Sequence, residues 1–243
     1  MKDGWEDRAA QWLAWARTPD FDAYWSYRDA FFALLPAPPG GRTLELGCGE
    51  GRVARDLTAR GHRVTALDPS PALLRAAAER DPDGEYVLGR AEALPFDDAT
   101  FEVVVAYNVL QVVGDMPRAV REAARVLASG GRLCVCVAHP LADAGRFAAD
   151  APDAPFVIAG SYLDARPVDD TVDRGGLTMR FDGTAYPLED YARAIEDAGL
   201  LVEAIREPAP AAGAAERPGR AAWARWHRIP MFLMLRALKP RRA

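Results

Sequence analysis

The sequence predicts an α/β fold in which helices flank a doubly wound, mainly parallel sheet of seven strands. Apolar strand-like runs alternate with helical segments, a glycine-rich loop follows the first strand, and an acid ends the second strand. The 243 residues are 50% hydrophobic, which is enough to build one buried core. We therefore expect a single domain over residues 1–243.

Two helices are expected before the sheet begins. Apolar residues recur at helical spacing from Trp5 to Ala16, and a second helical stretch runs from about residue 21 to residue 35. The Pro- and Gly-rich segment 36–40 ends this stretch. Aromatic side chains are dense here, and ligands of such sheets bind beyond the carboxyl ends of the strands. Residues 1–39 are therefore expected to form a helical lid over the ligand crevice.

The core elements follow in chain order. Strands are expected near residues 42–46, 63–67, 85–88, 101–107 and 131–137. Helices are expected to begin near Gly51, Pro71 and Pro117. The last elements are a helix over residues 187–198 that ends at Gly199, and strands near residues 200–205 and 231–238.

Glycines occupy three alternate positions directly after the first strand, at Gly47, Gly49 and Gly51. Because glycine has no Cβ, a ligand can approach the main chain closely there. A dinucleotide-binding loop would need its third glycine at the position of Arg52. The carboxylate of Glu45 would repel a pyrophosphate, whereas it would attract the sulfonium and amino groups of S-adenosylmethionine (SAM). The loop therefore favours SAM over a dinucleotide.

Asp68 ends the second strand, about 20 residues beyond the glycine loop. A carboxylate at this place can accept hydrogen bonds from both hydroxyl groups of a ribose. Ser70 and Pro71 follow as an N-cap and a first helical residue. The spacing predicts that Asp68 holds the sugar of a nucleoside-containing cofactor.

Three further segments follow the second strand in order. Residues 89–96 come after the third strand, residues 101–110 form the fourth strand and its turn, and residues 129–137 form a glycine turn that enters the fifth strand. Over roughly residues 40–140 the chain resembles the class I SAM-dependent methyltransferases, in particular the type 11 methyltransferase domain. The resemblance implies a Rossmann-like sheet of order 3-2-1-4-5-7-6 with the last strand antiparallel. It also implies SAM as cofactor and S-adenosylhomocysteine (SAH) as product.

The resemblance also implies a set of cofactor-binding residues. One position departs from the family, because Arg90 stands where an aspartate is common. Glu92 or a main-chain carbonyl near Ala91 must then accept the hydrogen bond of the adenine amino group. Two tyrosines of the lid, Tyr24 and Tyr27, are expected to touch the cofactor as well. The full expected set is Tyr24, Tyr27, Glu45, Gly47, Cys48, Gly49, Gly51, Asp68, Pro69, Ala91, Glu92, Asn108 and Gln111.

A long insertion separates the fifth strand from the next long helix. A connection of this length in a compact domain is usually functional, so we expect it to cap the substrate site. His139 follows the strand directly and can exchange a proton near neutral pH, which makes it the predicted general base and a predicted substrate contact. Tyr162, Arg180 and Tyr186 are the other predicted substrate contacts. The expected parts of the chain are a lid (1–39), a SAM-binding core (40–138), a substrate cap (139–187) and a completion of the sheet (188–243).

Composition argues against several classes of partner. The net charge of −5 is unlike that of a nucleic-acid-binding surface, although Arg217, Arg220, Arg225, Arg228, Arg236, Lys239, Arg241 and Arg242 form a basic C-terminal stretch. The three cysteines lack metal-ligand spacing, and Cys134 and Cys136 share one face of a strand. We expect core cysteines in a reducing compartment and no metal. The chain shows neither a leader nor a membrane span, which predicts a cytoplasmic location. We also expect a monomer or homodimer.

Three functions remain open at this point. The first is methylation of an O, N or C nucleophile on a small organic metabolite, with a base needed only if the acceptor must lose a proton. The second is the same chemistry on RNA or protein, with the basic C-terminal stretch as docking surface. The third is an NAD-dependent oxidoreductase or a non-catalytic nucleoside-binding module. The segment Ala106-Tyr107-Asn108-Val109 lacks an Asn-Pro-Pro-Tyr-like motif, which favours a small-molecule acceptor.

Overall fold

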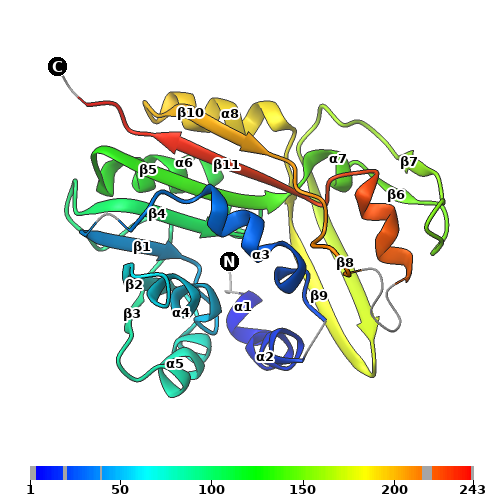
Figure 1. Ribbon diagram of the computed structural model, residues 1–243, viewed down its shortest axis with the longest axis horizontal. Helices are drawn as coiled ribbons and strands as arrows, with labels where there is room; N and C mark the ends of the chain where they lie inside the picture. The colour runs from blue at the N-terminus through cyan, green and yellow to red at the C-terminus, as the bar shows by residue number, and fades with distance from the viewer. Residues whose placement is uncertain (1–3, 19–20, 39, 215–220, 242–243) are drawn as a thin grey trace.

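The computed structural model describes residues 4–18, 21–38, 40–214 and 221–241. Its main sheet contains the strands β1 (Arg42–Leu46), β2 (Arg63–Asp68), β3 (Glu85–Leu88), β4 (Phe101–Tyr107), β5 (Leu127–Ala138), β10 (Leu201–Arg206) and β11 (Phe232–Leu238). Their order is β10-β11-β5-β4-β1-β2-β3 (Figure 1). β11 runs antiparallel to β5 and β10, and the other neighbours pair in parallel. The predicted Rossmann-like order, with an antiparallel last strand, is therefore confirmed.

The helices are α1 (Gly4–Asp7), α2 (Ala9–Arg17), α3 (Tyr24–Leu34), α4 (Arg52–Thr58), α5 (Pro71–Arg80), α6 (Met116–Val126), α7 (Pro140–Asp143), α8 (Leu188–Asp197) and the 3₁₀ helix η1 (Ala221–His227). The helices α4, α5, α6 and α8 lie at the predicted places, the first of the two predicted N-terminal helices is divided into α1 and α2, and α7 and η1 were not predicted. The side chain of Ser70 accepts a hydrogen bond from the Leu73 amide at 3.2 Å and so caps α5. Asp115 caps α6 in the same way through the Arg118 amide at 2.9 Å. In both helices a proline follows within the first turn, where its missing N–H costs nothing.

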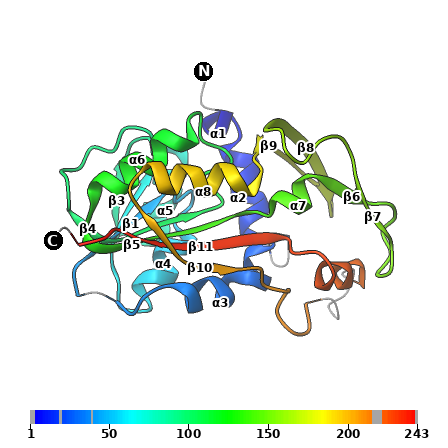
Figure 2. The ribbon, with the colours of Figure 1, turned by 90° about the horizontal axis from the view of Figure 1, so that it is seen from above.

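The core has two layers because successive strand residues point to opposite faces of the sheet. Val104 and Ala106 of β4 pack in one buried cluster with residues of α6 and α8. Val103, Val105 and Tyr107 pack in the other cluster with residues of α3 and α4. Figure 2 shows α6 and α8 on one side of the sheet and α3 and α4 on the other. Helices therefore cover both faces of the sheet. Since β1 to β5 pair in parallel, their carboxyl ends lie at the same edge of the sheet.

The two strand cysteines lie in the second of these layers. Cys134 and Cys136 are fully buried, unpaired thiols of the cluster that includes residues of α3 and α4. Their predicted position on one face of a core strand is confirmed. Among the residues that the structure describes, no group of three or more His, Cys, Asp or Glu side chains could hold a metal ion. Within the same ranges, no helix has the length and apolarity needed to cross a membrane.

The insertion after β5 contains four strands that the sequence analysis did not predict. They form two antiparallel hairpins, β6 (Gly145–Phe147) with β7 (Phe156–Ile158) and β8 (Arg166–Arg174) with β9 (Leu177–Ala185). In β8 the apolar Val168 and Val172 alternate with charged residues, and this half-buried pattern was missed. The turn Gly175-Gly176 between β8 and β9 is the signal that could have revealed the second hairpin, because both glycines adopt positive φ.

The N-terminal helices lie against the β8–β9 hairpin at the carboxyl end of the sheet (Figure 1). The rings of Trp15 and Phe181 meet edge to face with their centroids 5.9 Å apart. Arg8 forms an ion pair of 2.5 Å with Asp182. The guanidinium of Arg174 donates a hydrogen bond of 2.7 Å to the carbonyl of Phe21. These contacts join two distant parts of the chain over the edge where the parallel strands end.

Candidate functional site

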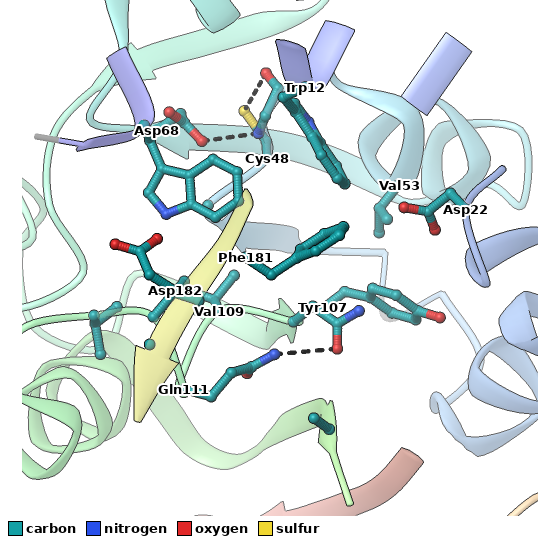
Figure 3. Close-up of a pocket in the computed structure, with 18 of the residues that line it drawn as sticks. Trp12, Asp22, Cys48, Val53, Asp68, Tyr107, Val109, Gln111, Phe181 and Asp182 are labelled. Atoms are coloured by element: carbon teal, nitrogen blue, oxygen red, sulfur yellow. Dashed lines mark hydrogen bonds between the residues drawn. The ribbon is translucent and has the colours of Figure 1, made fainter. Parts of the chain in front are cut away.

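A cavity of about 510 Å³ lies where the parallel strands end, between the N-terminal helices and the β8–β9 hairpin (Figure 3). This volume is in the usual range of roughly 300 to 1,000 Å³ for small-molecule sites. Many of the lining residues are apolar or aromatic, from α2, β1, β4 and the hairpin. The polar and charged lining residues are Asp22, Glu45, Glu50, Arg52, Asp68, Arg90, Glu92, Asn108, Gln111, Asp143, Asp170, Arg174, Asp182 and Thr184.

The glycine loop after β1 forms one wall of this cavity. Gly47 has a φ of +63°, and a Cβ at this position would lie 2.6 Å from Cγ2 of Val109. Gly49 has a φ of +56°, and its Cβ would lie 3.1 Å from Nε1 of Trp12. Both glycines line the cavity together with Cys48. The loop therefore brings bare main chain to the ligand space, because a side chain would strain the backbone at either position and would also collide with Val109 at position 47.

Asp68 lies next to this loop in the wall of the cavity and is only 5% exposed. Its Oδ2 accepts a hydrogen bond of 2.8 Å from the Gly49 amide, and its Oδ1 accepts one of 2.9 Å from the Ser70 amide. Asp68 therefore fixes the glycine loop and holds its carboxylate in the wall of the cavity. Pro69 lines the cavity next to it, as predicted.

Glu45 is the buried acid of the same wall. It is 2% exposed, and its Oε2 has no hydrogen-bond partner among the described residues. Burial raises the pKa of Glu45 to about 8, and repulsion by Asp68 adds to this effect. A cationic ligand group beside the carboxylate would restore its charged form. The residue is thus suited to a positive charge, as the sequence analysis proposed for SAM.

We expect SAM affinity to rise with pH, by up to about tenfold per unit, between pH 6 and pH 8. Below pH 8 the free protein carries a proton on Glu45, and this proton must leave before the carboxylate can pair with the cation. Above pH 8 the proton is already absent, so this contribution levels off. Calorimetric titration at several pH values measures the trend, and Glu45→Gln should remove it. A slope that persists unchanged in Glu45→Gln would assign the effect to another group.

The other predicted cofactor contacts of the core also line the cavity. They are Ala91 and Glu92 after β3, and Asn108 and Gln111 after β4. One oxygen of Glu92 accepts a hydrogen bond of 2.9 Å from the Gly114 amide, which fixes its position. Asn108 has a φ of +57° and accepts a hydrogen bond of 3.4 Å from the Gln111 side chain. The side-chain oxygen of Gln111 is buried and lacks a hydrogen-bond partner in the described part of the chain.

Three predicted cofactor contacts do not reach the cavity. Tyr24 is fully buried, and its hydroxyl donates a hydrogen bond of 2.5 Å to Asp56. Tyr27 is 1% exposed and packs edge to face on Phe232. Gly51 precedes α4, where a Cβ would lie 3.0 Å from Ala77 and from the hydroxyl of Tyr86. The structure therefore corrects these predictions, because Tyr24 and Tyr27 pack α3 against the core and Gly51 lies against Ala77 and Tyr86 at the start of α4.

The structure also contradicts both predicted roles of His139. Its Nδ1 accepts a hydrogen bond of 3.0 Å from the Leu141 amide, and its Nε2 lies 2.7 Å from Oε1 of Glu207. Nε2 therefore carries the proton, and neither nitrogen is available to a substrate. Burial lowers the pKa of His139, and the hydrogen bond with Glu207 partly opposes this effect. The residue caps α7 and does not line the cavity.

The remaining predicted substrate contacts lie outside the cavity as well. The exposed Arg180 forms a two-pronged ion pair of 2.6 Å with Asp169 on the outer face of the β8–β9 hairpin. The hydroxyl of Tyr162 accepts a hydrogen bond from the Leu188 amide, and Tyr186 packs on Tyr191. Strand alternation gives the reason for the error at Arg180, because its neighbour Phe181 points inward.

Several lining residues were not predicted from sequence. Trp12 lies over the glycine loop, and Phe181 projects from β9 into the centre of the cavity (Figure 3). The helical spacing of the apolar residues from Trp5 to Ala16 predicted a buried helix face that includes Trp12. No sequence pattern indicated that this face packs over the glycine loop. Asp143 of α7 and Asp170 of β8 also line the cavity. Burial raises the pKa of Asp143 to about 6, Arg166 opposes the shift, and Asp170 adds to it.

Comparisons with known proteins agree with this geometry. Residues 44–135 match a family model described as "Methyltransferase domain", of type 11. The matched range contains the glycine loop, Asp68 and the Ala91–Glu92 segment. It ends before the insertion that forms the hairpins.

Individual relatives are similar over parts of the chain. Malonyl-[acyl-carrier protein] O-methyltransferase of Serratia marcescens is 40% identical over 93 residues, covering 38% of this chain and 36% of that protein. Demethylmenaquinone methyltransferase of Thermobifida fusca is 39% identical over 120 residues, covering 47% and 50%. The chain thus spans half or less of these curated relatives. The crystal structure of an S-adenosylmethionine-dependent methyltransferase from Mesorhizobium loti matches with a TM-score of 0.72 and 25% identity, covering 90% of this chain and 99% of that one.

Proposed function

We propose that this chain, whose core belongs to the class I SAM-dependent methyltransferases, transfers a methyl group from SAM to a nucleophilic atom of a small organic molecule. The family match over residues 44–135 and the shared fold support the membership. One observation carries the proposal: Glu45 and Asp68 both face the cavity beside the glycine loop. Two carboxylates at this place favour a ligand that combines a positive charge with a ribose.

The residues present fit SAM at each of its parts. Asp68 places a carboxylate at the carboxyl end of β2, where a ribose would bind, and Glu45 has an unpartnered oxygen for a cationic group. Glu92 lies in the segment that would face the adenine and has one oxygen without a hydrogen bond in the described chain. This oxygen fits the role of the acceptor that Arg90 cannot supply. When bound, SAM supplies an electrophilic methyl group on positively charged sulfur.

The acceptor would occupy the part of the cavity between α2, the β8–β9 hairpin and β11. The walls of this part are apolar and aromatic, with contributions from Trp15, Phe21, Phe181 and Phe232. Such walls exclude water and orient an organic molecule, and orientation is the main requirement of a methyl displacement. Asp143 provides a carboxylate in this part of the cavity, and it replaces His139 as the proposed proton acceptor. An acceptor with an O–H, N–H or acidic C–H group fits this arrangement.

A macromolecular acceptor has less support. Most described members of the basic C-terminal stretch already bind other parts of the chain. Arg225 pairs with Asp150 at 2.7 Å, Arg236 pairs with Glu203 at 2.6 Å, and Arg228 donates to the Ala154 carbonyl at 2.8 Å. Arg217, Arg220 and Arg242 lie outside the described residues. Since surface cations bind phosphates only when free to reach them, these contacts argue against a docking surface for RNA.

Calorimetric titration of the purified protein tests the proposal. We expect saturable binding of SAM and SAH at one site and no binding of NAD at equal concentrations, because Arg52 stands where a dinucleotide-binding loop needs its third glycine. Mass spectrometry of reactions with small phenols, amines and carboxylic acids then identifies the acceptor by the gain of one methyl group. NAD binding without SAM binding would indicate an oxidoreductase instead. SAM binding without methyl transfer to any acceptor class, RNA and protein included, would indicate a nucleoside-binding module.

A further inference from the structure

Arg52 is a buried cation in the wall of the cavity, directly after the glycine loop. The residue is only 8% exposed, although it carries a full positive charge. Its guanidinium lies near two aromatic rings, 5.0 Å from the centroid of Trp12 and 4.5 Å from that of Tyr24. Cation–π attraction to both rings stabilises the guanidinium at this place. The surroundings of Arg52 therefore come from three helices: α2 provides Trp12, α3 provides Tyr24, and Arg52 itself begins α4.

Only part of the hydrogen-bonding capacity of Arg52 is used within the protein. Nη2 pairs with Oδ1 of Asp22 at 3.2 Å. Nη1 is buried and makes no hydrogen bond to any described residue. A guanidinium has five N–H donors, and a buried donor of a charged group without a partner is costly. Because Arg52 lines the cavity, a ligand can supply the missing acceptor.

A second donor lies on the same side of the sheet. The hydroxyl of Tyr107, at the end of β4, is buried without a hydrogen-bond partner in the described part of the chain, and the residue lines the cavity. Burial raises the pKa of Tyr107 well above its usual range, with smaller effects of Cys136 and Asp22, so the hydroxyl keeps its proton. Asp22 lines the cavity between the lid helices and completes the group (Figure 3).

These donors complement the unpartnered acceptor of Glu45. Glu45 and Tyr107 lie on neighbouring parallel strands, β1 and β4, and both line the cavity. In this wall, the carboxylate of Glu45 can pair with an ammonium group. The guanidinium of Arg52 and the hydroxyl of Tyr107 can bind a carboxylate. An α-amino acid carries this pair of charges on one carbon atom. Ligands with only one of the two groups would leave buried polar atoms unsatisfied.

We propose that Arg52 binds the α-carboxylate of the methionyl part of SAM, that Tyr107 donates a second hydrogen bond to it, and that Asp22 positions the guanidinium. This inference rests on the proposed function, since it assigns residues to one end of the same cofactor. It makes Arg52 a binding residue that selects the intact amino-acid tail. The sequence did not predict this role. Arg52 was noted there only as the residue that replaces the third glycine of a dinucleotide-binding loop.

Ligand pairs that differ only in the tail test the assignment. SAH carries the amino-acid group, whereas 5′-methylthioadenosine carries the same nucleoside and sulfur without it. In Arg52→Gln we expect SAH affinity, measured by calorimetry, to fall at least about 30-fold, and 5′-methylthioadenosine affinity to change less than about threefold. Decarboxylated SAM should bind Arg52→Gln and the unmodified protein with similar affinity. An equal loss for SAH and 5′-methylthioadenosine would overturn the proposal, because Arg52 would then only hold the lid on the core.

A milder variant keeps the test valid if Arg52→Gln does not fold. Tyr107→Phe removes one hydroxyl and leaves the aromatic packing with Phe31 in place. It should lower SAH affinity by roughly three- to tenfold and leave 5′-methylthioadenosine affinity unchanged. An unmodified protein that binds neither SAM nor SAH would refute the proposed function and this inference together. An unmodified protein that binds SAM and decarboxylated SAM equally well would refute the carboxylate assignment alone.

Discussion

Replacement of Asp68 by alanine should weaken SAM binding by about 2 to 3 kcal/mol, or roughly 30- to 150-fold. The side chain has two functions in the proposed complex. Its oxygens would accept the ribose hydroxyls, and they also accept the amides of Gly49 and Ser70. Loss of the carboxylate therefore removes ligand hydrogen bonds and frees the glycine loop from the end of β2. Calorimetric titration with SAM and SAH measures the effect.

Asp68→Asn separates the two functions. The side-chain oxygen of the asparagine can still accept a hydrogen bond from one of the two amides, Gly49 or Ser70. Its NH₂ group would face the N–H of the other amide, and two donors cannot form a hydrogen bond. We expect an intermediate loss of SAM affinity and a smaller decrease of the melting temperature than in Asp68→Ala. The matched control is Asp81→Ala, at the end of α5, which lies outside the cavity lining and should leave SAM affinity unchanged. SAM affinity that is the same in Asp68→Ala and the unmodified protein would show that another group holds the ribose.

The parts of the site that could be predicted are those encoded by short local patterns. Glu45 lies on β1, the glycine loop follows that strand, and Asp68 ends β2, so their spacing along the chain determines where they meet in a parallel sheet. The seven strands of the sheet were predictable for the same reason, because each is an apolar run of typical length. Their order came from the family resemblance, since pattern alone does not determine which strands pair.

The predictions failed where the fold depends on contacts between distant segments. Tyr24, Tyr27 and Trp12 all belong to an aromatic, helical part of the chain, and only the packing against the core determines that Trp12 faces the cavity. His139 ends a strand at the expected edge, but the carboxylate of Glu207, 68 residues away, occupies its Nε2. Position at the edge of a sheet is therefore insufficient to assign a base, because the second nitrogen must also be free.

The largest effect on catalysis is expected at Asp143. Asp143 lines the cavity, and Arg166 lies near enough to its carboxylate to oppose the rise of its pKa. Since burial raises the pKa of Asp143 to about 6, the group is mostly ionised at pH 7 and still able to take a proton from an acceptor. Asp143→Asn should lower the turnover of an acceptor that must lose a proton by about 10²- to 10⁴-fold. The affinity for SAM should stay within about twofold, because the residue lies apart from the glycine loop.

The pH profile gives a second, independent readout of the same role. A base acts only when deprotonated, so kcat/KM for the acceptor, measured at saturating SAM, should rise with pH in the unmodified protein and reach half of its plateau near pH 6. In Asp143→Asn the residual rate should lack this rise. Asp164→Asn, an exposed carboxylate of the same insertion that is not part of the cavity lining, serves as the matched control and should retain both rate and profile. If Asp143→Asn loses turnover but keeps the rise near pH 6, Asp143 positions the acceptor and a different group accepts the proton.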